Sequence, residues 1–113
     1  MGHVTIDNVI VADYQKNGIV VAGAGSTGKI TNTTVTGNGP TDVIAQNGIE
    51  VVDGAAATIS TSTIRDHAYT PKGTVSCGLL VIAAGGVNDD TNVYLNNEKD
   101  KCVVNGRGGT YVG

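Results

Sequence analysis

Residues 64 to 73, "IRDHAYTPKG", carry the densest set of side chains able to do chemistry in this 113-residue sequence. Asp66 or His67 can act as an acid or a base, and Arg65 can bind a carboxylate such as that of a uronic acid. Together these groups suit acid–base chemistry on a substrate that carries a carboxylate. Arg65, Asp66 and His67 are therefore the candidate catalytic residues.

Further side chains suited to sugars lie before and after this segment. Tyrosine rings can stack on sugar rings, and charged side chains can bind hydroxyl or carboxylate groups. The candidate carbohydrate contacts are Asp13, Tyr14, Lys16, Tyr69 and Lys72. Asp42 belongs to the same polar set. The alternative interpretation is that these charges form the solvated rim of a soluble protein, where a pair such as Arg65 and Asp66 contributes well under about 1 kcal/mol.

The elements that position these residues repeat at intervals of about 30 residues. Gly18, Gly48 and Gly78 are spaced by 30, and so are the apolar residues that follow each of them. A second set of apolar pairs, five residues apart, precedes each glycine: Ile6 and Val11, Ile30 and Val35, Ile59 and Ile64, with Asp89 and Tyr94 continuing the series. Equal positions recurring with similar residues predict a parallel solenoid, in which equivalent side chains stack about 4.8 Å apart.

The Asn-Gly in "QNGIEVVDGA" (46 to 55) taken alone would predict a hairpin. Its recurrence in "KNGIVVAGAG" (16 to 25) favours a corner of a coil instead. The separations between the two apolar sets vary: 8 residues from Val11 to Ile19, 14 from Val35 to Ile49 and 15 from Ile64 to Leu79. Loops of unequal length are therefore inserted at one corner, and the candidate residues gather along that edge.

The composition fits an all-β protein. Phe and Trp are absent, Gly accounts for 17 residues and Pro for 2, so the core must consist of Val, Ile, Leu and Ala. The net charge is −3, and the 7 Lys and Arg residues do not cluster. This argues against a nucleic-acid partner, because phosphate binding requires clustered basic residues. The sequence also shows neither a basic amphipathic face nor an apolar stretch for membrane insertion.

The segments "VTIDNVIV…NGIVVAG", "KITNTTVTGNG…NGIEVVDG" and "ATISTSTIRD…CGLLVIAAG" resemble the right-handed parallel β-helix family of pectate lyases, polygalacturonases, alginate epimerases and phage tailspikes. The predicted fold is a single segment over 1–113 with about four coils, short or truncated. Coils are well defined over 3–86 and degenerate over 87–113. The resemblance implies a polysaccharide partner and an extracellular or cell-surface location, although the chain shows no signal peptide. We expect no cofactor.

The sequence departs from the catalytic motifs of that family. It lacks the Gly-His-Gly and Arg-Ile-Lys segments expected of polygalacturonases, the Asp-Pro-His motif of alginate epimerases and an acidic calcium cluster. We therefore expect a non-catalytic structural or glycan-facing module of a secreted or surface carbohydrate-active protein. The alternative is a lyase or hydrolase fragment that uses Arg65, Asp66 and His67. A remote alternative is ice binding through "TNT" (31 to 33) and "TST" (61 to 63), although "DNV" and "DTN" interrupt that array.

The two cysteines and the chain ends raise separate questions. Asn17, Asn47 and Cys77 share one position in successive coils, and Cys102 is expected to occupy it in the fourth. We expect a reduced ladder, with a disulfide as the alternative, because side chains in register point in parallel. Two cysteines without a nearby histidine predict no metal site. Neither end offers a helix or polar lid, so we expect self-association through open ends or continuation in a longer chain.

Overall fold

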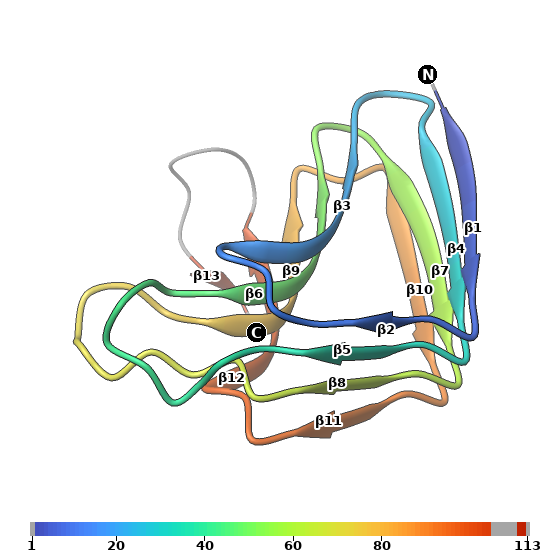
Figure 1. Ribbon diagram of the computed structural model, residues 1–113. Coiled ribbons are helices and arrows are strands. Elements are labelled where there is room, and N and C mark those ends of the chain that lie inside the picture. Colours follow the sequence, from blue (N-terminus) through green and yellow to red (C-terminus); the bar gives the residue numbers. More distant parts are fainter. Residues whose placement is uncertain (1, 105–110, 113) are drawn as a thin grey trace.

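The computed structural model describes residues 2–104 and 111–112, and within them every regular element is a β-strand. The strands form three sheets (Figure 1). The first sheet contains β1 (His3–Asp7), β4 (Thr27–Thr31), β7 (Ala56–Ser60) and β10 (Gly86–Asp90). The second contains β2 (Ile10–Val11), β5 (Thr34–Thr36), β8 (Thr63–Arg65) and β11 (Val93–Leu95). The third contains β3 (Asn17–Ala22), β6 (Asn47–Val52), β9 (Cys77–Ile82), β12 (Lys99–Val104) and β13 (Tyr111–Val112).

From β1 to β12, consecutive strands enter different sheets, so three strands complete one coil and the fourth begins the next. Neighbouring strands pair in parallel throughout, apart from β13, which pairs antiparallel with β12. The predicted all-β parallel solenoid of about four coils is therefore confirmed. The fourth coil begins at β10, and residues 105–110 and 113 of the predicted last coil lie outside the described residues.

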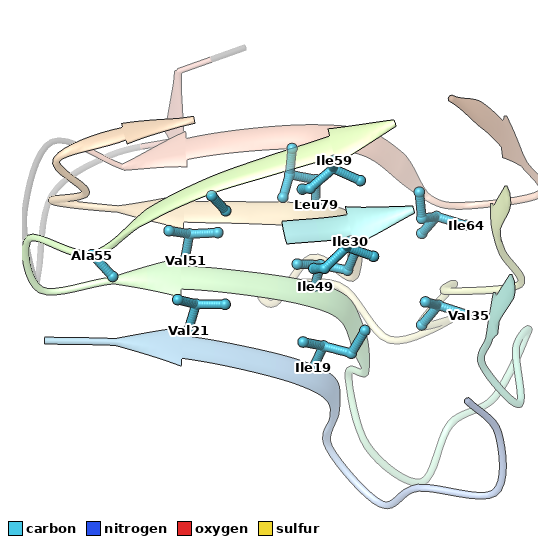
Figure 2. Close-up of a cluster of buried hydrophobic side chains, with 11 residues drawn as sticks. Ile19, Val21, Ile30, Val35, Ile49, Val51, Ala55, Ile59, Ile64 and Leu79 are labelled. Carbon is cyan, nitrogen blue, oxygen red and sulfur yellow. The ribbon is translucent and has the colours of Figure 1, made fainter. Parts of the chain in front are cut away.

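The register between coils confirms the predicted rows. Ile6 pairs with Ile30, and Ile30 pairs with Ile59. The other rows are Val11, Val35 and Ile64; Ile19, Ile49 and Leu79; and Val21, Val51 and Val81. Figure 2 shows the buried members of these rows stacked inside the coils, among them Ile30, Ile49, Ile59 and Ile64, which are fully buried. The β-branched residues thus supply a core that needs no large aromatic ring.

The Asn-Gly of 47 and 48 begins β6 and makes no hairpin, because β6 runs parallel to β3 and β9. A Cβ atom on Gly48 would lie 2.6 Å from the carbonyl oxygen of Gly78 in the next coil. Glycine recurs at this position because adjacent coils approach too closely for a side chain.

The fourth coil ends three of the apolar rows with polar residues. Asp89 continues the row of Ile59, Tyr94 that of Ile64, and Lys101 that of Leu79. The Lys101 Nζ lies 2.5 Å from Asp89 Oδ2, and the Tyr94 hydroxyl donates to Asp89 Oδ1 at 2.9 Å. Burial raises the pKa of Asp89, but hydrogen bonds from Lys101, Asn92 and Tyr94 outweigh it and hold that pKa below its usual value. The expectation that neither end has a polar lid is therefore wrong at the C-terminal end.

The lid is partial, and the two ends differ. A cavity of about 460 Å³, lined in part by Leu79, Val87 and Val103, remains beside Lys101. At the opposite end, β1, β2 and β3 have no strand beyond them among the described residues, and Ile10 is 79% exposed. The described part of the chain contains no helix long and apolar enough to cross a membrane.

Cys77 and Cys102 form a disulfide, so the expected reduced ladder is wrong. Cys102 pairs with Leu80 in the strand register, whereas Lys99 pairs with Cys77. The cysteines are therefore three residues out of register, with Cα atoms 6.0 Å apart, and the objection that applies to side chains in register does not hold. The bond is buried in a second apolar cluster with Leu80 and Val104, and it fastens the fourth coil to the third.

We expect the Cys77→Ala/Cys102→Ala variant to lose stability, because the disulfide closes a loop between residues 25 apart in the sequence. Urea unfolding should show a free energy of unfolding lower by about 3 kcal/mol. Reduction of the unsubstituted protein controls for packing, since it opens the cross-link and keeps both side chains. If neither change lowers the free energy by more than about 1 kcal/mol, the cross-link is not a major source of stability.

Self-association through an open end stays a prediction, and the N-terminal edge is now its best basis. We expect the mass measured by light scattering to rise with concentration in the micromolar range, because unpaired strands accept a further strand. Ile10→Lys should lower that mass by placing a charge on the edge strand. Thr58 is exposed on β7, which is paired on both sides by β4 and β10, so Thr58→Lys is the matched control away from an edge. A stable monomer at all these concentrations would refute the prediction.

Candidate functional site

The candidate residues lie in the loops between the second and third sheets, apart from Arg65, which ends β8. Residues 12–16, 37–46 and 66–76 make these connections, and all three loops leave the solenoid on the same side (Figure 1). We call this side the loop edge. Asp13 and Asp66 begin their loops at equivalent positions, each with a positive φ angle, 61° and 65°. A left-handed residue turns the chain sharply out of the strand, and aspartate tolerates this conformation.

His67 lies beneath the loop edge and is fully buried. Its Nδ1 lies 2.8 Å from Asn97 Oδ1, and its Nε2 is hydrogen-bonded to the hydroxyl of Tyr14. The Asn97 Oδ1 also accepts the His67 backbone N–H, while the Asn97 Nδ2 donates to the carbonyl of Ile64. Because this fixes Oδ1 as an acceptor, Nδ1 must carry the proton and Nε2 must accept from Tyr14.

The polar chain Tyr14–His67–Asn97 joins loops of the first, third and fourth coils. The second coil encloses the imidazole ring, since a Cβ on Gly37 would lie 2.7 Å from His67 Cδ2 and one on Gly48 would lie 2.9 Å from Cε1. Tyr14 stacks beside the ring, with centroids 6.0 Å apart. No space is left for a substrate at the imidazole, so in this conformation His67 is placed to support the fold.

Burial controls the ionisation of His67 and Tyr14. Burial lowers the pKa of His67 below its ordinary value of 6.5, although Asn97 and Asp66 partly oppose the shift. The pKa of the Tyr14 hydroxyl is raised, first by burial and then by the charge of Asp66. Both groups are therefore neutral at pH 7, in agreement with the hydrogen-bond directions.

The other predicted site residues do not come together at one place on the loop edge. Arg65 Nε and Asp66 Oδ2 form a surface ion pair at 3.0 Å. Lys16 Nζ donates to the carbonyl of Ala45 at 2.7 Å, which ties the first loop to the second. The backbone N–H of Tyr69 is 3.4 Å from Glu98 Oε1, and Lys72 lies in an exposed part of the third loop.

A shallow cavity of about 310 Å³ opens between loops 12–16 and 37–46. It is lined by Tyr14, Gln15, Asn38, Thr41, Val43, Ile44 and Gln46. Tyr14 is the one predicted site residue in that lining, and no lining side chain is charged. Gln46 holds the cavity together, because its Oε1 accepts from the Asn38 backbone and its Nε2 donates to the Tyr14 carbonyl, each at 2.7 Å.

The sequence did not identify Asn97 and Gln46 as residues of the candidate site. Asn97 lies 30 residues beyond His67, so the repeat itself could have placed it in the next coil under the histidine. Gln46 gives no such signal, because it lies at the end of an inserted loop. Among residues 2–104 and 111–112, no group of three His, Cys, Asp or Glu side chains could hold a metal ion.

We expect the free energy of unfolding to fall as the pH drops below 6.5. The unfolded chain binds a proton at its ordinary histidine pKa, whereas the folded pKa is lower, so the loss grows from pH 6.5 down to the folded pKa. One proton allows at most about 1.4 kcal/mol per pH unit. Urea unfolding between pH 5 and 7.5 measures this slope.

His67→Gln should remove that slope, and His3→Gln, which changes the other histidine, should leave it in place. Persistence of the full slope in His67→Gln would show that other groups cause the pH dependence.

No family model, no curated protein and no solved structure matches the chain. The solenoid is therefore established by its own strand pairing, and a function has to be argued from the loop edge.

Proposed function

We propose that the chain is a non-catalytic module of the pectate-lyase-like parallel β-helix class. It presents its loop edge to polysaccharide as part of a secreted or cell-surface carbohydrate-active protein. Its main task is structural, with contact to glycans through the loops.

The observation that carries this proposal is the state of His67. A general acid or base must reach the proton that it transfers. His67 has no exposed surface and both ring nitrogens are already bonded, so the strongest candidate for proton transfer serves to join coils. Arg65 and Asp66 neutralise one another at the surface, which suits a solvated rim.

Two further features support the location and the partner. A buried disulfide is typical of proteins that fold in an oxidising compartment, outside the cytosol. The cavity beside Tyr14 offers amide, hydroxyl and apolar groups, the combination that sugar rings require. The threonine array gives less support to ice binding, because Thr33 is 1% exposed and faces the interior.

Incubation with polygalacturonate, alginate and neutral glycans tests the proposal. We expect no new unsaturated or reducing ends, while the protein is retained by at least one immobilised polysaccharide. Retention would follow from contacts along the loop edge, and the absence of products from the burial of His67.

Asp66→Ala and Asp13→Ala form a matched pair, since both residues occupy the same corner position in different coils. Product release that Asp66→Ala abolishes and Asp13→Ala preserves would establish the enzyme alternative and overturn the proposal.

A further inference from the structure

We propose that the cavity between loops 12–16 and 37–46 binds a neutral sugar unit and discriminates against uronates. This inference rests on the proposed glycan-facing function and specifies its ligand. It departs from the first expectation, in which Arg65 and the lysines would bind an acidic sugar.

The charges around the cavity favour an uncharged ligand. Every side chain that lines it is neutral. A uronate carboxylate would lose water there without gaining a cation, which is costly in a partly enclosed site. Lys16 does not line the cavity and already donates to the Ala45 carbonyl, and Arg65 is paired with Asp66. The chain also carries a net charge of −3, which opposes the approach of a polyanion.

The cavity lining contains both polar and apolar groups, which match the two kinds of surface on a sugar ring. Gln15 and Asn38 present exposed side-chain amides, which both donate and accept hydrogen bonds. Thr41 also lines the cavity, and its hydroxyl accepts from the Val43 backbone at 3.2 Å. Val43 is 83% exposed and, with Ile44, supplies an apolar wall for the C–H face of a ring.

The cavity is held in shape before any ligand arrives. Gln46 is 2% exposed and bonds to the backbone of both loops, and Lys16 adds a third link at 2.7 Å. Below them, Tyr14 is fixed by its hydrogen bond to His67. A site that is already ordered loses less entropy on binding, so a shallow cavity can still select a ligand.

Isothermal titration with defined hexasaccharides tests the inference. The probes are cellohexaose, mannohexaose, xylohexaose and hexagalacturonate. We expect at least one neutral chain to bind and hexagalacturonate to bind at least tenfold more weakly. Asn38→Ala and Val43→Ser should each weaken the neutral ligand about tenfold, the effect of losing one contact worth about 1.4 kcal/mol.

Val20→Ser is the matched control, because Val20 is 50% exposed on β3 and does not line the cavity. It should leave the affinity unchanged, and the melting temperatures of all variants should show that they fold. Neutral binding that Asn38→Ala and Val43→Ser leave intact would overturn this inference.

The same titrations separate this inference from the function on which it rests. Preferential binding of hexagalacturonate, lost in Lys72→Gln or Arg65→Gln, would overturn the neutral ligand and leave the glycan-facing function standing. If no glycan binds in titration and none retains the protein on a column, both proposals fail.

Discussion

Backbone hydrogen bonding between parallel strands of successive coils is the constraint on which the structure depends. Each strand of one coil pairs in register with its counterpart in the next, 22 to 30 residues away, so a side chain at one position meets the same position of the next coil. Apolar residues then form continuous rows, and a glycine becomes necessary wherever two coils approach too closely. The same constraint requires that polar groups facing the neighbouring coil find partners there.

Several polar side chains inside the stack meet that requirement. Asn47 donates to Asn17 in the coil before it and accepts from the backbone of Cys77 in the coil after it, at 3.2 and 3.0 Å. Thr33 and Ser62 continue this pattern at another corner, where the backbone N–H of Thr33 donates to the Ser62 hydroxyl. Such ladders satisfy the backbone groups that the corners would otherwise leave without partners. His67 follows the same rule, with Asn97 in the next coil as its partner.

The sequence predicted the fold well because the spacing of the repeat gives the register of strand pairing between coils. Rows such as that of Ile19 and Ile49 required only a spacing of 30 and a preference for β-branched residues in strands. The cysteines were misplaced because Cys102 lies outside that spacing, in a coil with a shorter connection, and its register follows from the strand pairing. The burial of His67 was missed because a polar residue after a strand suggests a loop, while its enclosure depends on glycines from another coil.

Position relative to the repeat distinguishes structural from functional polar residues in this solenoid. A residue with a counterpart in the adjacent coil is drawn into a ladder, and its hydrogen-bonding capacity is then used by the fold. Gln15 and Val43 lie in inserts of unequal length and outside the paired strands, whereas the backbone on both sides of Asn38 still donates to the third coil, from Gly37 to Arg65 and from Gly39 to Asp66. The side chains of Gln15, Asn38 and Val43 line the cavity. Asn47 and Asn38 carry the same side chain, but that of Asn47 bonds to the coils before and after it, while Asn38 lies at the cavity.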